Sequence, residues 1–168
     1  MLLTFFTSLL LLYQSWFGTF GPATAPQADL LATTSATVVR VIDGDTIDVQ
    51  ETAQSPVIRV RYIGIDTPEP YAHGTPDCGS VAASTRNREL VENKTVEIVP
   101  GPDGYDKYHR VLAYVYVDDV FVNETLIREG YATVMMIKPN TAYKSSFTTL
   151  FKKAQTDKLG IWSICTNH

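Results

Sequence analysis

The sequence predicts a small, mainly β domain of the α+β class, preceded by a hydrophobic N-terminal segment. Short runs rich in Val, Ile and Tyr are separated by Asp, Gly and Pro turn residues, and segments with helical spacing lie between them. The chain has 168 residues, of which 45% are hydrophobic and 19% charged, a composition typical of a single globular domain. We therefore expect one domain with its own core.

The chain starts with an uncharged segment at Leu2–Phe20, which is rich in Leu and Phe. We expect residues 1–20 to be a signal peptide or a membrane anchor, 21–36 a linker rich in Ala, Thr and Pro, and 37–168 the folded domain. A short apolar core followed by cleavage favours the signal peptide. The full stretch of about 20 residues is just long enough to cross a bilayer, which favours the anchor. Either alternative predicts an extracytoplasmic protein, secreted or anchored to the membrane through residues 2–20.

The folded domain is expected to begin with three strands. Residues 37–41 and 46–49 are strand-like and flank the turn signal Asp43-Gly44. The third run, at 57–65 (VIRVRYIGI), ends abruptly at Asp66-Thr-Pro. These three runs predict three strands with charged residues at their ends.

The rest of the domain alternates helices and strands. A helix is expected at 80–94, where Ser80 is suited to cap the first turn. The elements expected after it are strands at 95–99, 111–117 and 120–122, a helix at 123–128 ended by Gly130, a strand at 131–136, and a helix at 145–158 ended by Gly160.

Two cysteines, Cys78 and Cys165, are not in Cys-x-x-Cys spacing, and the sequence offers no partners for a four-ligand zinc site. In an exported protein they are expected to form one disulfide, which would join the start of the 80–94 helix to the C-terminal tail. The alternative is two unrelated free thiols.

Charged residues gather in places where the backbone is held rigidly. Asp43 and Asp45 lie in a turn between strands, and Asp66 and Thr67 lie at the end of the third strand. Carboxylate and carbonyl oxygens held on strand ends are ligands that Ca²⁺ takes. Taken singly, an Asp-Gly pair is more often a plain hairpin turn, and Asp-Thr-Pro-Glu also suits a helix start.

Two arginines and one glutamate accompany these acids. Arg61 and Arg110 carry guanidinium groups that can bind a phosphodiester, and Glu69 follows Asp66 closely enough to act on a water at a metal. Arg110 has an alternative role as a simple ion-pair partner of Asp106. The formal net charge of −4 gives no bulk attraction for a polyanion, so if the substrate is nucleic acid we expect modest, salt-sensitive affinity.

In order and spacing, these residues resemble the staphylococcal (micrococcal) nuclease family over about residues 37–162. The matching segments are Val41-Ile-Asp-Gly-Asp-Thr46, Arg61-x-x-x-x-Asp66-Thr-Pro-Glu69, Asp106-Lys-Tyr-x-Arg110, Val122-Asn-Glu124, Lys138-Pro-Asn140 and Gly160-Ile-Trp162.

The resemblance implies an OB-fold five-stranded barrel with three helices. It also implies that Asp45, Asp66 and the Thr67 carbonyl bind Ca²⁺ with Asp43 behind them, and that Arg61, Glu69 and Arg110 are catalytic. Residues Lys107 and Tyr108 are then candidate substrate contacts. The implied activity is endonucleolytic hydrolysis of DNA and RNA, preferably single-stranded, at the P–O5′ bond to leave 3′-phosphates, by a monomer.

Two segments depart from the family pattern. Met135, Met136 and Ile137 stand where tyrosines would pack on a nucleotide, so we expect weaker contact with base or sugar, because stacking on an aromatic ring contributes roughly 1–3 kcal/mol per base. The loop after Glu69 lacks lysines, and His73 replaces them only in part. His73 with Asp77 and Cys78 could be taken for a metal site, but a lone loop histidine is more often ordinary surface.

Two other functions remain open at this level. The domain could be a non-catalytic nucleic-acid-binding module of the same fold, although Asp45, Asp66, Glu69 and both arginines are all present. It could also be an envelope protein in which the acids hold only a stabilising calcium ion.

Overall fold

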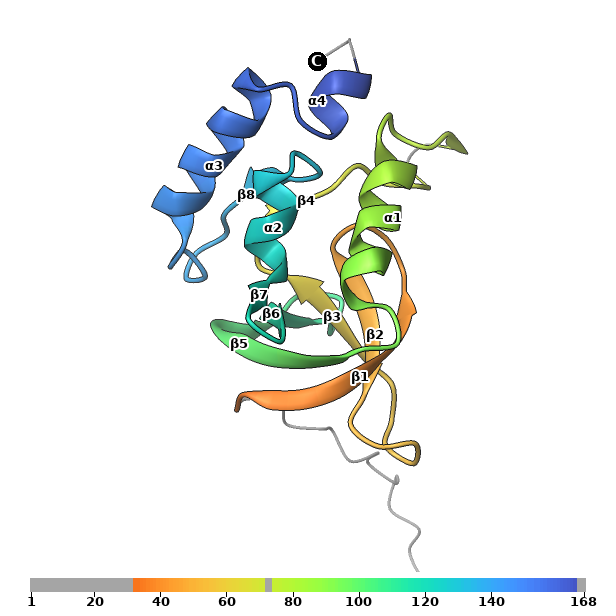
Figure 1. Ribbon diagram of the computed structural model, residues 1–168. Coiled ribbons are helices and arrows are strands. Elements are labelled where there is room, and N and C mark those ends of the chain that lie inside the picture. Colours follow the sequence, from red (N-terminus) through yellow and green to blue (C-terminus); the bar gives the residue numbers. More distant parts are fainter. Residues whose placement is uncertain (1–31, 72–73, 166–168) are drawn as a thin grey trace, which may run out of the picture.

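The computed structural model describes residues 32–71 and 74–165, and its centre is a closed five-stranded barrel (Figure 1). Neighbouring strands pair antiparallel in the order β3-β2-β1-β5-β6, and a parallel pairing of β3 with β6 closes the barrel. The expected OB-type fold is therefore confirmed. The barrel strands are β1 (Thr34–Val41), β2 (Thr46–Gln50), β3 (Ile58–Tyr62), β5 (Thr95–Tyr105) and β6 (Val111–Val117).

The barrel interior is filled by branched aliphatic side chains. Because side chains alternate between the two faces of a strand, every second residue points inward and is buried. In β1, for example, Ala36 and Val38 are buried while Thr37 and Val39 are exposed. The fully buried interior residues include Ile47, Val49, Val60, Val96, Ile98, Ala113 and Val115.

The helices lie at one end of the barrel (Figure 1). The central helix α2 contacts β6 on the barrel and has α1 and α3 as neighbours. Two small strand pairings complete the described part: β4 (Gly64–Asp66) with β8 (Thr133–Met135), and β6 with β7 (Val120–Phe121). The helices are α1 (Ser80–Val91), α2 (Val122–Arg128), α3 (Lys144–Thr156) and α4 (Ile161–Ile164).

Several element boundaries differ from the expected ones, and four of these differences change the course of the chain. Strand β1 begins at Thr34, inside the segment expected to be linker, because residues 34–37 pair with β5. The run 57–65 is two strands, β3 and β4, separated at Ile63. Strand β5 continues through the expected loop at 100–104, with an irregular register after Pro100. The short helix α4 was not expected.

Buried asparagine side chains explain two of these differences. The Asn123 amide donates to the Ile63 carbonyl (2.9 Å), and its oxygen accepts from the Val115 N–H (2.9 Å). These two backbone groups therefore keep a hydrogen-bond partner where the chain leaves the barrel at Ile63. The Asn140 side chain bonds both the N–H and the carbonyl of Asp103, which holds the outer part of β5 in place. Such long-range contacts replace strand pairing where the local sequence predicts a loop.

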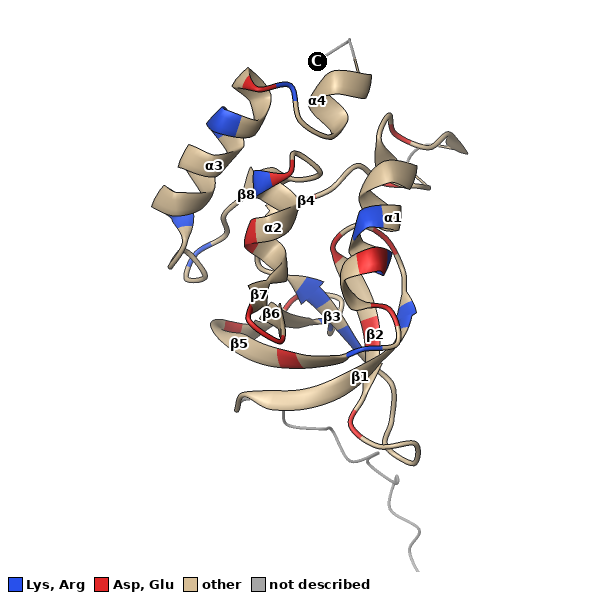
Figure 2. Cartoon of the chain, viewed as in Figure 1, with Lys and Arg blue, Asp and Glu red and all other residues tan. Residues whose placement is uncertain are grey.

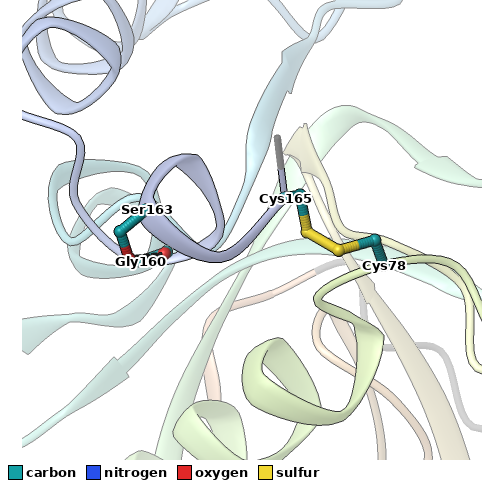
Figure 3. The surroundings of a disulfide bond; sticks show 4 residues. All are labelled: Cys78, Gly160, Ser163 and Cys165. Carbon is teal, nitrogen blue, oxygen red and sulfur yellow. Dashed lines mark hydrogen bonds between the residues drawn. A yellow bond between two sulfur atoms is a disulfide. The ribbon is translucent and has the colours of Figure 1, made fainter. Parts of the chain in front are cut away.

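Cys78 and Cys165 form the expected disulfide, which joins the segment before α1 to the residue after α4 (Figure 3). The Cα atoms are 5.9 Å apart, within the usual range. Gly79 lets these segments meet: its φ is +84°, and a Cβ there would lie 2.5 Å from the Ile161 side chain. The C-terminal end is thereby fixed to the start of α1.

Several expectations fall on residues outside the described ones. These are the signal peptide or anchor at 1–20, most of the linker at 21–36, and the loop residue His73. Within 32–71 and 74–165, no helix combines the length and apolar character needed to cross a bilayer.

Candidate functional site

The turn between β1 and β2 carries two buried aspartates. The Asp43 carboxylate accepts a hydrogen bond from the Asp45 N–H (3.0 Å), and the Ile42 N–H donates to the Thr46 carbonyl (3.0 Å). Gly44 packs directly against Thr67, since a Cβ on Gly44 would lie 2.6 Å from the Thr67 hydroxyl oxygen. A glycine at this position therefore lets the turn approach the end of β4.

Asp45 is fully buried, and two residues hold its Oδ2 atom. Its Oδ2 accepts hydrogen bonds from the Thr67 N–H (2.8 Å) and hydroxyl (3.0 Å) and forms an ion pair with Arg61 Nη1 (2.8 Å). Burial raises the pKa of Asp45 to about 7, although Arg61 and the Thr67 hydrogen bonds oppose the rise. A divalent cation beside this carboxyl would favour its ionised form.

Arg61 connects the two halves of the site. Its Nη1 lies on Asp45 and donates to the Ile65 carbonyl (3.0 Å), while its Nη2 donates to Asp66 Oδ1 (2.7 Å). The Asp45 and Asp66 carboxylates are therefore only one guanidinium apart, although 20 residues lie between Asp45 and Asp66 at the end of β4 in the sequence. The Arg61 side chain is only 10% exposed, whereas that of Asp66 is 37% exposed.

Helix α1 supports this turn through Asn87, which sequence reasoning missed. Asn87 is fully buried, donates to the Asp43 carbonyl (2.9 Å) and accepts from the Tyr62 hydroxyl (3.0 Å). The signal available in the sequence was weak: an asparagine within a helix is ordinary, and only its burial distinguishes it. Asn87 fixes the acidic turn against β3 and α1 together.

Glu69 lies beside the cluster in an exposed loop. Burial raises the pKa of Glu69, and the nearby charges of Asp43 and Asp66 raise it further, while Arg61 and Arg110 lower it. All four charges therefore act on this one carboxyl. The loop is closed by Asp77, whose carboxylate accepts the Glu69 N–H (3.1 Å) and whose own N–H donates to the Glu69 carbonyl (2.9 Å).

Arg110 lies immediately before β6 and forms an ion pair with Asp106, which is the alternative role considered for it in the sequence. The Asp106 carboxylate accepts from the Arg110 Nε (2.7 Å) and N–H (2.9 Å) and from the Tyr108 N–H (2.9 Å), so it organises the whole loop from 106 to 110. Two cations lie near the Tyr108 ring, with Lys107 Nζ 4.9 Å and the Arg110 Cζ 5.5 Å from its centroid.

A groove of about 450 Å³, here called the main groove, brings the two arginines together. Met135 and Ile137, 41% and 69% exposed, line it, so the segment that departs from the family pattern does face this groove. Among its walls are Arg61, Ile65, Tyr105, Lys107, Tyr108, Arg110, Met135 and Ile137. Its mixture of cationic and apolar walls suits a nucleotide, which has both a phosphate and a base.

The donor set at this site fits a hard divalent cation. The Asp45 and Asp66 carboxylates contact the two terminal nitrogens of Arg61, Nη1 and Nη2, and Ca²⁺ combines carboxylates with carbonyls and waters. Within residues 32–71 and 74–165, no group of three or more His, Cys, Asp and Glu side chains is placed to hold a metal. The role of the Thr67 carbonyl stays a prediction, since the contacts from Thr67 to Asp45 are made by its N–H and hydroxyl.

Known proteins share this sequence pattern. The family model of staphylococcal nuclease homologues matches residues 59–164, which is more than half of the chain. The SPbeta prophage-derived endonuclease YokF of Bacillus subtilis is 42% identical over 138 residues, covering 76% of this chain and 43% of that protein. Endonuclease YncB of the same organism is 41% identical over 140 residues, covering 77% and 62%. This chain thus spans less than two thirds of either Bacillus protein.

A relative of more similar length is a thermonuclease of Staphylococcus intermedius. It is 39% identical over 126 residues, which make up 74% of both chains. The similarity therefore covers most of each protein. With the family match over residues 59–164, this identity shows that the chain belongs to the staphylococcal nuclease family.

Proposed function

We propose that this protein is a calcium-dependent endonuclease that hydrolyses phosphodiester bonds of DNA and RNA, with single strands preferred. Cleavage at the P–O5′ bond, leaving 3′-phosphates, is part of the proposal. The observation that carries it is the position of Arg61, whose guanidinium contacts both the Asp45 and the Asp66 carboxylates at the edge of the main groove. The proposed cation ligands, Asp45 and Asp66, are thus in contact with the proposed phosphate-binding group, Arg61.

The side chains supply a complete set of roles. Asp45, Asp66 and the Thr67 carbonyl are the groups that would hold Ca²⁺, and the bound ion would neutralise charge on the phosphoryl group. Arg61 and Arg110 bind the non-bridging oxygens of the phosphate and the extra negative charge of the transition state. Glu69, whose pKa is raised, accepts the proton of the attacking water.

The groove supports broad rather than base-specific recognition. Met135 and Ile137 give apolar contact without a stacking ring, which leaves Tyr108 as the exposed aromatic residue of the main groove. Stacking on one ring is tolerant of base identity. A formal net charge of −4 adds no general attraction for nucleic acid, so we expect affinity that falls steeply with salt.

The proposed place of action is outside the cytoplasm, as a secreted or membrane-anchored monomer. Two observations support it: the uncharged apolar segment within residues 1–20 and the Cys78–Cys165 disulfide. Disulfides persist in oxidising compartments and are rare in the cytosol.

A digestion assay tests this function. The purified full chain is incubated with plasmid DNA, single-stranded DNA and RNA in Ca²⁺, in Mg²⁺ and in EGTA. We expect cleavage in Ca²⁺, with single strands cut fastest, and none in EGTA. Cleavage that continues unchanged in EGTA would contradict the assigned site.

Substitution of Arg61 sharpens the same assay. Arg61→Lys keeps the charge but loses the forked contact with two carboxylates and a phosphate, so we expect the rate to fall at least about 100-fold. Arg128→Lys is the matched control, because Arg128 is an ion-paired arginine on α2 with a 50% exposed side chain. Binding of nucleic acid without product would favour the non-catalytic module. A calcium-induced rise in melting temperature without hydrolysis would favour the calcium-stabilised envelope protein.

A further inference from the structure

A second groove lies on the other side of the Tyr108–Arg110 wall. It has a volume of about 360 Å³ and is lined by Asp48, Val57, Arg59, Tyr108, His109 and Arg110. Tyr108 and Arg110 also line the main groove, so the two grooves share one wall. None of the roles assigned above uses Asp48, Arg59 or His109.

The strand register places three charged residues in a row that leads to this groove. Arg40 of β1 is paired with Asp48 of β2, and Asp48 is paired with Arg59 of β3. Residues directly opposite each other on neighbouring strands project from the same face. The parallel pairing of Val60 with Val111 brings the start of β6, and so Arg110, to the same level as Arg59.

This row contains two arginines and only one carboxylate. Arg59 makes a two-pronged contact with Asp48 through Nε (2.8 Å) and Nη2 (3.1 Å), while Arg40 approaches the same carboxylate at 3.5 Å. Asp48 therefore has two arginine partners, whose side chains are 66% exposed for Arg40 and 46% for Arg59. One carboxylate neutralises one guanidinium, so this trio has a net positive charge on a chain whose formal total is −4.

The spacing along β3 relates this surplus charge to the proposed catalytic arginine. Arg59 and Arg61 are two residues apart on one strand, so they share a face and their Cα atoms are about 6.8 Å apart. This is close to the distance between consecutive phosphates of an extended strand of nucleic acid. A phosphate at Arg61 would leave the next phosphate of the same strand near Arg59.

We propose that this second groove binds the nucleotide next to the cleaved phosphodiester, with Arg59 and Arg40 contacting its phosphate. This inference rests on the proposed nuclease function and extends it to a second subsite. The Tyr108 ring, 67% exposed, stands between the grooves and offers a stacking face, which only an unpaired base can use. The second groove is therefore a site for single-stranded DNA or RNA.

The test compares two substrates and two pairs of arginines. Arg40→Gln/Arg59→Gln removes two charges from the row, and Arg88→Gln/Arg128→Gln removes two arginines that are ion-paired on α1 and α2 with side chains 46% and 50% exposed. The substrates are a single strand of about twelve nucleotides and a nitrophenyl ester of a single nucleotide, which is too short to reach the second groove. All variants are checked for an unchanged melting temperature.

We expect Arg40→Gln/Arg59→Gln to raise the KM for the oligonucleotide about tenfold and to leave kcat and KM for the short ester unchanged. The slope of log KM against log salt should fall by about 1.4, because each lost contact with a single strand removes about 0.7. The control pair should match the wild type with both substrates. An oligonucleotide KM and salt slope equal to those of the control would overturn the proposal.

A second variant, which removes a negative charge from the row, tests the proposal if the double arginine variant does not fold. Asp48→Asn keeps the size of the side chain and releases both arginines, so it should lower the oligonucleotide KM and steepen the salt slope. An unchanged KM in this variant would also count against the second groove.

A binding measurement separates this inference from the nuclease function itself. Fluorescence anisotropy of the labelled oligonucleotide in EDTA reports binding when no cleavage occurs. If the wild type binds with a salt slope that depends on Arg40 and Arg59 but never cuts in Ca²⁺, the nuclease function fails and the binding groove stands. If it cuts in Ca²⁺ but its binding ignores both arginines, the second groove fails alone.

Discussion

Asn87 is the residue through which α1 acts on the acidic turn. It is fully buried and supplies a hydrogen-bond partner to two buried polar groups, the Asp43 carbonyl and the Tyr62 hydroxyl. Leaving a buried polar group without a partner costs about 1–3 kcal/mol, which exceeds the typical net gain from a single hydrogen bond. The side chain therefore contributes both to stability and to the position of Asp43.

Asn87→Ala is expected to lower the free energy of unfolding by about 3 kcal/mol, since it leaves two buried groups unpaired. It should also raise the calcium concentration needed for half-maximal cleavage, because the Asp43–Asp45 turn loses its support. Urea unfolding and calcium-dependent digestion measure the two effects.

Tyr62→Phe is the control at this scale. It removes only the hydroxyl that donates a hydrogen bond to Asn87, and it leaves the hydrogen bond from Asn87 to the Asp43 carbonyl in place. We expect a smaller loss of stability and an unchanged calcium requirement. If both variants shift the calcium requirement equally, Asn87 is a general stabiliser and not a support of the turn.

At the scale of elements, the loop between β5 and β6 depends on one carboxylate. Burial alone would raise the pKa of Asp106, but hydrogen bonds from the Arg110 N–H and guanidinium and from the Tyr108 N–H outweigh it and lower the pKa. A folded-state pKa below the unfolded one means that Asp106 stabilises the fold above its unfolded pKa of about 3.9. That contribution is lost as the pH falls through the lower, folded value.

Asp106→Asn should therefore be less stable than the wild type at neutral pH. The difference should shrink as the pH falls below about 4. Urea unfolding at a series of pH values measures it, with Asp119→Asn, in the exposed turn between β6 and β7, as the control. A stability difference that stays constant down to the lowest pH would show that Asp106 acts through shape and not through charge.

Elements also show how far the sequence could predict the fold. Short runs rich in Val, Ile and Tyr predicted β2 and β6 closely, because these strands lie in the barrel wall and are largely buried. The break between β3 and β4 and the extension of β5 were missed because Asn123 and Asn140, distant in the sequence, supply the hydrogen bonds there. No local pattern encodes such a partner.

Some residues of the candidate site were likewise predicted from the sequence, and others were not. Asp45, Asp66 and Arg61 were found because they stand in short motifs whose order resembles one family, and the fold does bring them into contact. Asn87 and the Arg40–Asp48–Arg59 row were missed, because they become visible only when helix packing and strand register are known. Motifs thus predicted the charged residues of the candidate site, and the fold adds those that support them.

At the scale of the whole molecule, charge is distributed without a dominant sign. Figure 2 shows acidic and basic residues interspersed over the barrel strands and helices, in keeping with the formal net charge of −4. Under the proposed function, attraction of nucleic acid would come from local groups such as Arg61 and Arg110. This arrangement would limit non-specific binding and make the proposed cation more important.

The Cys78–Cys165 disulfide acts on the whole chain because it closes a loop with a sequence separation of 87 residues. The chain-entropy model gives an upper limit of about 4–5 kcal/mol for such a loop. We expect Cys78→Ser/Cys165→Ser to lower the free energy of unfolding by up to this amount, measured by guanidinium unfolding. Adding reductant should destabilise the wild type and leave the double variant unchanged. Equal stability of the two proteins without reductant would contradict a stabilising role.

The central claim is that Asp45 and Asp66 hold one cation together beside Arg61. Calorimetric titration of the full chain with Ca²⁺ tests this most directly, with Asp45→Asn and Asp66→Asn measured alongside. We predict one calcium ion per wild-type chain and binding lost or greatly weakened in either variant. Calcium binding of equal affinity and stoichiometry in all three proteins would contradict the claim.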